Sequence, residues 1–244
     1  MQSLRNIHRF LSHQSIYPLI LSSGLAVIFY FLRVSYAHNW NYRNLLWNLI
    51  LAWVPYIFSF LAATIHNLFP KRRWLIPLTA LPWLAFFPNA PYMVTDFYHL
   101  TERPPVPLWY DIGLIAIFAF TGLFLAIASL RTMHHLVESS FGKLTGWLFA
   151  IFVLSLAGLG VYLGRFGRYN SWDLLIQPKI VVKDIAIQLL NPLDNLGFVG
   201  FTLMFTAIMV VFYLMFVSIN RLEPSNLPNH DLQKGPDESS NLLP

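Results

Sequence analysis

The 244-residue chain is 56% hydrophobic and only 11% charged, with a mean hydropathy of +0.54. Soluble domains usually carry about 25% charged residues, so this composition excludes an ordinary soluble domain and indicates a multi-pass membrane protein. The formal charge of +5 does not indicate nucleic-acid binding, because the basic residues lie at the ends of apolar runs, where they anchor membrane helices. Since the chain has no cysteine, disulfides, thiolate metal sites and cysteine nucleophiles are excluded.

Long apolar runs divide the chain into predicted membrane spans. A span needs about 20 apolar residues, and runs of that kind occur at roughly residues 16–36, 44–69, 112–130, 144–163 and 198–219. A further run, residues 74–87, contains Pro77 and Pro82 and is too short for a hydrocarbon core of about 30 Å. We expect it to be a broken helix, or to span only by including the polar residues 89–96. The sequence therefore predicts an all-α, polytopic transmembrane bundle of about six spans with a broken third helix.

The segments outside the spans give a predicted orientation. Residues 1–15 are predicted to be a cytoplasmic N-terminal segment, residues 16–219 the transmembrane domain, and residues 220–244 a disordered polar C-terminal tail. Short loops rich in Lys and Arg favour the cytoplasmic side, and Lys71, Arg72 and Arg73 form the densest basic cluster. With six spans, this cluster places both termini in the cytoplasm.

Residues 87–100, FPNAPYMVTDFYHL, form the first polar motif, at the end of the short apolar run. Pro88 and Pro91 each bias the preceding residue away from the helical region, which predicts an irregular elbow over residues 87–90. Pro91 also suits the first position of a new helix, with Asn89 or Ala90 near its cap. The motif thus predicts an interruption followed by a helix that starts at the membrane boundary.

The helix after this elbow would place Tyr92, Asp96 and His99 on one face, at spacings of four and three residues. That face is typical of proton or substrate handling. A metal site would need a third ligand from Asp173 or Glu102, and we predict none. The alternative is a structural helix entry, in which Asp96 pairs with an arginine and His99 is hydrogen-bonded at the interface.

Residues 164–173, GRFGRYNSWD, form the second polar motif. Arg165 and Arg168 are three residues apart and would share a helical face that binds a phosphate or carboxylate. Asn170 or Ser171 would cap a following helix, with Asp173 near its positive end and Trp172 at head-group depth. The alternative is that the arginines are interfacial anchors paired with Asp96 or Asp173. With six spans, both motifs lie on the same membrane face and form one composite site.

The segment of residues 179–190 is too short and too charged to span a membrane. As a helix, it would have one apolar face and one charged face. This pattern predicts an amphipathic helix at the interface, above the bundle. On the other side of the membrane, His134 and His135 are adjacent, and adjacent residues point in different directions on a helix. We therefore expect them to be interfacial residues and not a metal-binding pair.

The two motifs, PNAPYMVTDFYHL and YLGRFGRYNSWDLL, resemble the hallmark stretches of an uncharacterised family of bacterial multi-pass membrane proteins, known only as a domain of unknown function. The resemblance covers roughly residues 45–216. It implies a bacterial integral membrane protein of about six helices, located in the plasma (inner) membrane. It carries no known substrate, cofactor or catalytic residue.

No established catalytic motif occurs in the sequence. The leading hypothesis is binding or transport of an anionic or lipid-like small molecule from the bilayer, with no cofactor. The alternatives are an intramembrane enzyme acting on a lipid head group or lipid-linked sugar, with candidate catalytic residues Asp96, His99 and Asp173, and a non-catalytic membrane subunit or scaffold. The predicted substrate-binding residues are Asn89, Tyr92, Asp96, His99, Arg165, Arg168, Asn170, Trp172 and Asp173.

Overall fold

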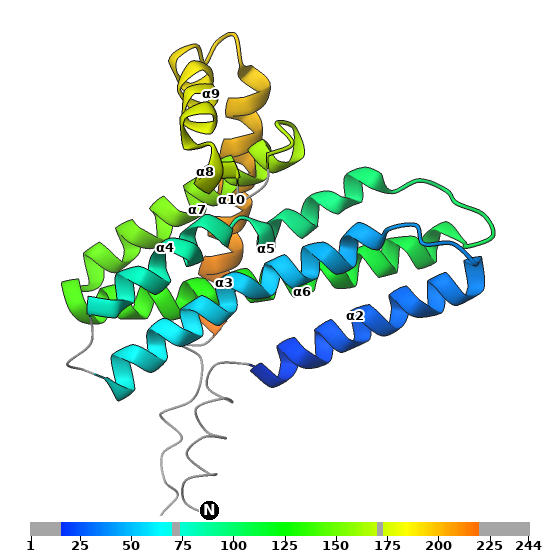
Figure 1. Ribbon diagram of the computed structural model, residues 1–244, viewed down its shortest axis with the longest axis horizontal. Coiled ribbons are helices and arrows are strands. Elements are labelled where there is room, and N and C mark those ends of the chain that lie inside the picture. The colour runs from blue at the N-terminus through cyan, green and yellow to red at the C-terminus, as the bar shows by residue number, and fades with distance from the viewer. Residues whose placement is uncertain (1–15, 70–73, 170–172, 220–244) are drawn as a thin grey trace, which may run out of the picture.

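The computed structural model describes residues 16–69, 74–169 and 173–219, and its framework is a set of packed helices (Figure 1). Within these ranges, the one strand-like pairing is an isolated bridge between Arg103 and Val106. The predicted all-α class is confirmed. The helices, in chain order, are α2 (Ile16–Ala37), α3 (Arg43–Leu68), α4 (Ile76–Phe86), α5 (Asn89–Tyr92), the 3-10 helix η2 (Met93–His99), α6 (Leu108–Phe141), α7 (Lys143–Arg165), α8 (Asp173–Ile176), α9 (Pro178–Leu190) and α10 (Leu196–Ile219).

Five of the described helices, α2, α3, α6, α7 and α10, are long and apolar enough to cross a membrane. Four of them begin and end close to the predicted residues. The exception is α6, which has 34 residues and continues well past the predicted end at Leu130. The apolar run stops at Arg131, but the backbone remains helical until Gly142, whose φ of 91° is easily adopted by glycine alone. Hydropathy therefore located this helix but underestimated its length.

Helix α6 lies at the centre of the bundle, with α2, α3, α5, η2 and α7 packed against it. Its buried side chains include Leu114, Phe118 and Leu125. Gly122 permits the closest of these approaches, because a Cβ atom at this position would lie 2.4 Å from the carbonyl oxygen of Ala90 in α5. The polar segment that follows α4 is thereby held directly against the central helix.

The predicted break in the third apolar segment is confirmed. Helix α4 ends at Phe86, the short α5 begins at Asn89, and η2 completes the segment at His99. In Figure 1 these pieces follow one another along the bundle, from the end where α7 starts to the end where α6 starts. Together with the five long helices, this broken segment gives the chain about six passes.

The backbone at the break differs from the prediction of an irregular elbow. Phe87 has helical torsion angles, with φ −54° and ψ −40°, although a proline follows it. Its side chain is 1% exposed and packs against Trp83, with ring centroids 5.1 Å apart. The Asn89 side-chain amide donates a hydrogen bond of 3.0 Å to the carbonyl oxygen of Phe86. Ring burial and this hydrogen bond outweigh the steric preference of a residue before proline. Pro91 consequently lies inside α5 and not at its first position.

The predicted amphipathic helix corresponds to α9, which lies with α8 above the bundle in Figure 1. Val181 is 4% exposed, whereas Lys179 and Lys183 point into solvent. The hydroxyl of Tyr169, in the loop after α7, donates a hydrogen bond to the Asp184 carboxylate. This bond ties α9 to the loop that carries the second polar motif.

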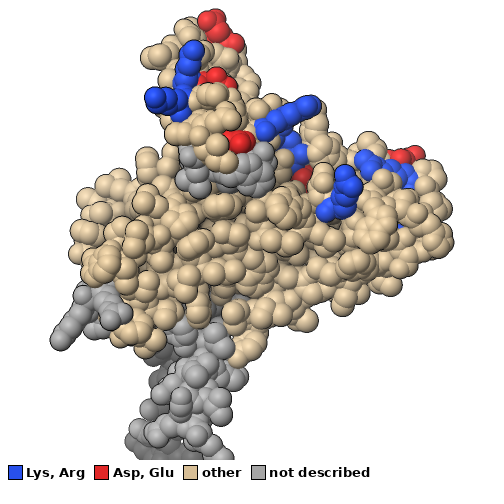
Figure 2. Space-filling model, in the orientation of Figure 1, with Lys and Arg blue, Asp and Glu red and all other residues tan. Residues whose placement is uncertain are grey.

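Charged side chains are unevenly distributed over the surface. On the face shown in Figure 2, they gather at α9 and along the upper right of the view, and a broad uncharged surface lies below them. Large apolar side chains such as Leu21, Leu81 and Leu148 are 60–75% exposed. Since soluble monomers rarely expose contiguous apolar patches of more than a few hundred Å², this surface is that of a helical membrane bundle.

Candidate functional site

The two polar motifs meet through Arg165, the last residue of α7. Its Nη2 donates to Asp96 Oδ1 over 2.7 Å and to Thr95 Oγ1 over 2.6 Å, and its Nε donates to the same Thr95 oxygen over 2.9 Å. Its Nη1 lies 2.5 Å from Nε2 of His99. The planar guanidinium lies over the Tyr92 ring, 4.4 Å from the ring centroid. Every edge and one face of this guanidinium therefore have a partner in α5 or η2.

This arrangement is a structural ion pair. The side chains of Arg165 and Asp96 are only 7% and 8% exposed, and buried charges are tolerated when they are paired and hydrogen-bonded. Asp96 is bonded on both oxygens, because its Oδ2 accepts a hydrogen bond of 2.9 Å from Nδ2 of Asn48 in α3. A carboxylate held in this way is poorly placed to accept a proton as a general base. The geometry matches the alternative in which Asp96 pairs with an arginine.

His99 contributes to the same network from the exposed side. Because a guanidinium only donates hydrogen bonds, Nε2 of His99 must be the acceptor, and a neutral ring then carries its proton on Nδ1. Within residues 16–69, 74–169 and 173–219, no three His, Asp or Glu side chains come together as a metal site. Asp96 and His99 therefore have no third metal ligand among these residues.

Arg168 does not share a face with Arg165, contrary to the prediction. Helix α7 ends at Arg165, and Arg168 adopts a left-handed conformation with φ 58°. The turn is closed by a hydrogen bond of 3.2 Å from the Tyr169 amide to the carbonyl oxygen of Leu163, and the Tyr169 ring covers Gly167 so closely that a Cβ there would lie 2.9 Å from it. A helix that ends in this way sends the two arginines in different directions.

The exposed Arg168 side chain forms no ion pair or hydrogen bond with any residue that the structure describes. Asp173 begins α8, as expected for a carboxylate in the first turn of a helix. The predicted site residues Asn170 and Trp172 lie outside the described residues. Arg168 is thus the available cation of the second motif, whereas Arg165 is fully engaged.

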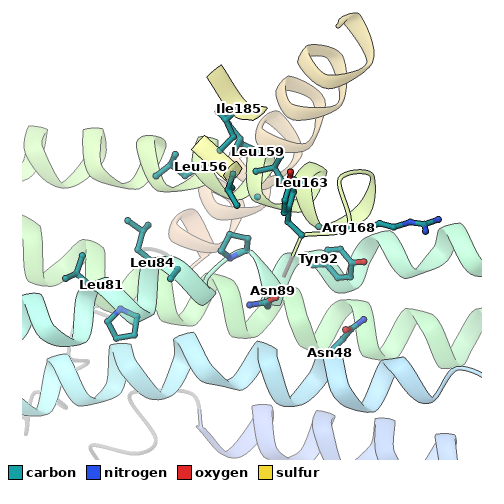
Figure 3. Close-up of a pocket in the computed structure, with 17 residues that line it drawn as sticks. Asn48, Leu81, Leu84, Asn89, Tyr92, Leu156, Leu159, Leu163, Arg168 and Ile185 are labelled. Carbon is teal, nitrogen blue, oxygen red and sulfur yellow. The ribbon is translucent and has the colours of Figure 1, made fainter. Parts of the chain in front are cut away.

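A groove lies between α4 and α7 and is closed by α9 and the loop after α7 (Figure 3). It adjoins the Arg165 network through Tyr92, which lines the groove and carries the Arg165 guanidinium over its ring. Its volume is about 790 Å³. Gly160 lets α7 approach the break in the third segment, since a Cβ there would lie 2.6 Å from Cγ of Pro88. We call it the α4–α7 groove, and it is lined by Asn48, Leu81, Pro82, Leu84, Ala85, Pro88, Asn89, Tyr92, Leu156, Leu159, Gly160, Leu163, Gly164, Arg168, Tyr169, Val181 and Ile185.

The groove changes in polarity along its length. Leucines from α4 and α7 line one end, and Figure 3 shows Leu81, Leu84 and Leu156 away from the labelled polar side chains. The other end is lined by Asn48, Asn89, Tyr92 and Arg168, and Figure 3 shows the exposed Arg168 side chain extending outward from this end. Four of the described residues predicted for the composite site do not line it, namely Asp96, His99, Arg165 and Asp173. The first three form the network behind the wall that contains Tyr92.

Helix α9 covers the groove through Val181 and Ile185. Its attachment to the loop depends on the hydrogen bond from Tyr169 to Asp184. This bond, followed by desolvation and the negative charges of Asp184 and Asp173, raises the pKa of the Tyr169 phenol above its usual value of 10.0. The bond therefore persists at neutral pH and across the range in which a free tyrosine begins to ionise.

A buried ion pair between α2 and α6 was not predicted from the sequence. Arg33 and Asp111 form a bidentate ion pair of 2.6 and 3.1 Å that is 0–1% exposed. The Arg33 guanidinium also donates to Asn39 over 3.0 Å and lies 4.9 Å from the centre of the Tyr42 ring. The sequence places Arg33 at the end of one span and Asp111 near the start of another, on the same predicted face. That shared face was the available signal, but spacing alone does not identify a partner 78 residues away.

His134, predicted to be an interfacial residue, is buried between helices of the bundle. It is 6% exposed, and its Nδ1 lies 2.6 Å from the hydroxyl of Tyr213 in α10. Gly146 in α7 makes the room, because a Cβ there would lie 2.9 Å from the imidazole. His135 is exposed, as expected. This burial was not predicted, because α6 extends beyond its apolar run and is covered there by α7 and α10.

Comparison with known proteins places this chain in a family without assigning an activity. No curated protein and no solved structure matches it. One family model, described as a protein of unknown function (DUF1361), matches residues 47–215. This range includes both polar motifs, the α4–α7 groove and the Arg165 network. Since the match covers more than half of the sequence, the chain belongs to the family described as protein of unknown function, DUF1361.

Proposed function

We propose that this protein binds an anionic, lipid-like molecule in the α4–α7 groove. The observation that carries the proposal is the polarity of the groove, which has leucines at one end and Arg168 with polar side chains at the other. A membrane amphiphile has the same polarity along its length, with an apolar chain and a polar head group. The volume of about 790 Å³ also falls within the range of roughly 300–1,000 Å³ that is usual for ligand pockets.

The apolar end of the groove supports entry from the bilayer. Leu81 lines the groove and is 68% exposed, so this end opens on the apolar surface of the bundle. The break between α4 and α5 also lines the groove, through Pro88 and Asn89, so the interrupted segment forms part of the cavity wall. An acyl chain would therefore enter laterally, without passing through water.

The polar end supports an anionic head group. Arg168 has no carboxylate partner among the described residues, and a guanidinium binds phosphate or carboxylate through parallel hydrogen bonds. Ionisable side chains at the membrane are functional candidates. Arg165, by contrast, is neutralised by Asp96 at 2.7 Å. We assign Arg168 as the head-group residue and the Arg165 network as the support for the wall behind it.

The proposal is tested by photolabelling of the purified full-length protein in nanodiscs. The probes are a phosphodiester lipid and a zwitterionic lipid, each with a diazirine in its acyl chain. We expect the anionic probe to label peptides that contain Leu84, Leu156 and Leu159. Arg168→Gln should reduce this labelling and leave labelling by the zwitterionic probe unchanged. Arg43→Gln, which removes an exposed arginine outside the groove, is the matched control.

Two results of this experiment would contradict the proposal. One is equal labelling of the groove peptides by both probes, unaffected by Arg168→Gln. The other is labelling confined to peptides outside the groove. Either result would mean that the groove has no preference for an anionic amphiphile.

We also propose a bacterial plasma-membrane location with both termini in the cytoplasm. Counting the broken third segment with the five long helices as six passes would put residues 16 and 219 on the same side, and the basic cluster at residues 71–73 favours the cytoplasm for that side. Because the chain has no native cysteine, single cysteines report sidedness cleanly. Thr101→Cys should react with an impermeant thiol reagent added to the periplasmic side, and Ser140→Cys should not. The reverse pattern would invert the orientation.

A further inference from the structure

We infer that the head group bound in the α4–α7 groove carries a single negative charge together with hydroxyl groups, as in the phosphodiester of a polyol. This inference rests on the proposed function and specifies its ligand. Among the 17 described residues that line the groove, only Arg168 is charged at neutral pH. Tyr92 and Tyr169 are phenols, which ionise only near pH 10 or above. The lining residues therefore offer one positive charge, which the exposed Arg168 side chain carries at the mouth of the polar end.

The neighbouring charges do not add to this total. The charge of Arg165 is cancelled by Asp96, and neither residue lines the groove. Asp184 places a negative charge next to Ile185 at the rim, where it accepts the hydrogen bond from Tyr169. Lys179 and Lys183 are exposed on α9 and are not part of the lining. Residues 170–172 are Asn, Ser and Trp, none of which is ionised at neutral pH.

One positive charge matches one negative charge. A phosphomonoester carries about −1.5 to −2 charges at pH 7, so its second charge would have no partner in this lining. Uncompensated charge at the membrane is costly, and the carboxylate of Asp184 at the rim would oppose it further. A phosphodiester has a single charge, which Arg168 can neutralise.

Two uncharged polar groups indicate hydroxyls on the ligand. The Nδ2 of Asn48 donates to Asp96, and because a carboxylate only accepts hydrogen bonds, the Oδ1 of Asn48 must face elsewhere. This oxygen accepts no hydrogen bond from any described residue, although Asn48 lines the groove. The Tyr92 hydroxyl, at the same end, likewise has no hydrogen-bond partner among the described residues (Figure 3). A polyol supplies the donors and acceptors that these two atoms need.

The experiment is native mass spectrometry of the full-length protein in detergent. Three lipids with identical dioleoyl chains are compared, namely phosphatidylglycerol, phosphatidic acid and phosphatidylcholine. Glycerophosphoglycerol, which has the head group without the chains, serves as a soluble competitor. We expect phosphatidylglycerol to bind about tenfold more tightly than phosphatidylcholine, whose head group has no net charge, as one charge-assisted contact would give. We also expect it to bind more tightly than phosphatidic acid, whose second charge has no partner in the lining and whose head group lacks the glycerol hydroxyls. Arg168→Gln should lower its affinity to that of phosphatidylcholine.

A gain-of-charge variant tests the charge count directly. Asn89→Lys adds a second cation at the polar end and should shift the preference toward phosphatidic acid. Because Asn89 also closes the turn after α4, Ile185→Lys on α9 provides a second cation that leaves this turn untouched. Circular dichroism and thermal unfolding show whether each variant is folded. If folded variants with an added cation keep the preference for phosphatidylglycerol, the charge-matching inference is wrong.

The remaining outcomes separate this inference from the proposed function. If wild-type protein prefers phosphatidic acid and Arg168→Gln abolishes that preference, the single-charge inference fails and the anionic groove stands. If all three lipids bind equally with or without Arg168, both fail. If the affinity of glycerophosphoglycerol equals that of phosphatidylglycerol, the acyl chains contribute nothing to binding. That result would overturn the lipid-binding proposal.

Discussion

The ion pair between Arg165 and Asp96 gives a sharp test of whether this centre is structural or catalytic. In Asp96→Asn the shape is kept, but Arg165, 7% exposed, loses its counter-charge. The new amide has one acceptor oxygen, whereas Asp96 accepts from both Arg165 and Asn48. Removing one partner of a buried pair costs about 3–5 kcal/mol. Because the contacts of Arg165 to Thr95 and His99 remain, we expect about 3 kcal/mol, or roughly a 150-fold smaller ratio of folded to unfolded protein.

The assay is reversible unfolding in mixed micelles, followed by far-ultraviolet circular dichroism, in a double-mutant cycle with Arg165→Met. Each single variant should lose about 3 kcal/mol, and the double variant should lose far less than the sum, because neither charge is left alone. Lipid binding by the folded fraction of Asp96→Asn should match that of wild type. Additive losses would refute the pairing. Lipid turnover by wild type that stops in Asp96→Asn would show that the centre is catalytic.

Four further outcomes follow from the packing. Gly158→Ala should lose about 1–3 kcal/mol of unfolding free energy, because its Cβ would lie 2.8 Å from the Thr202 carbonyl oxygen, while Gly24→Ala, with open space around it, should be neutral. Arg33→Met should lose about 3–5 kcal/mol by leaving the buried Asp111 unpaired, and adding Asp111→Leu should restore most of that stability. Leu156→Trp should fill the apolar end of the groove and abolish lipid photolabelling, whereas Leu148→Trp, 60% exposed on the same helix, should not. The raised pKa of the Tyr169 phenol preserves its hydrogen bond to Asp184, which holds α9 over the groove. Lipid exchange, measured by fluorescence, should therefore accelerate only above the usual tyrosine pKa of 10.0. In Tyr169→Phe, which lacks this bond, lipid should exchange rapidly at every pH.

Much of the helical framework was predictable because the bilayer imposes a simple rule on sequence. Apolar runs of about 20 residues are needed for spanning, and the ends of α2, α3, α7 and α10 follow those runs closely. Where another force determines an end, the rule fails. The end of α6 is set by Gly142 and not by hydropathy, and the helical geometry of Phe87 is set by ring packing against Trp83.

The sequence predicted that the two polar motifs lie together, but it did not predict that Arg165 and Arg168 have different partners. Topology placed the two motifs on one face, and the contacts of Arg165 with Asp96 and His99 confirm that they meet. The separation of Arg168 from Arg165 could not be predicted from residue spacing, because the left-handed ending of α7 depends on how Tyr169 packs over Gly167. Asn48 was missed for another reason. A single asparagine inside an apolar run belongs to no sequence pattern that would mark it as part of a site.

Both ends of the broken third segment are held by their neighbours, which limits how far the groove can change in width. The Arg165 network clamps η2 to α7, so the polar end has a constant width. Helix α4 lies outside that clamp, but it packs along α3, and Trp83 in α4 donates a hydrogen bond of 3.0 Å to Ser129 in α6. The break at residues 87–88 is itself buried, since Phe87 is 1% exposed. A lipid bound as proposed would therefore have to fit between walls that are held at both ends, so the groove should select acyl chains by their shape.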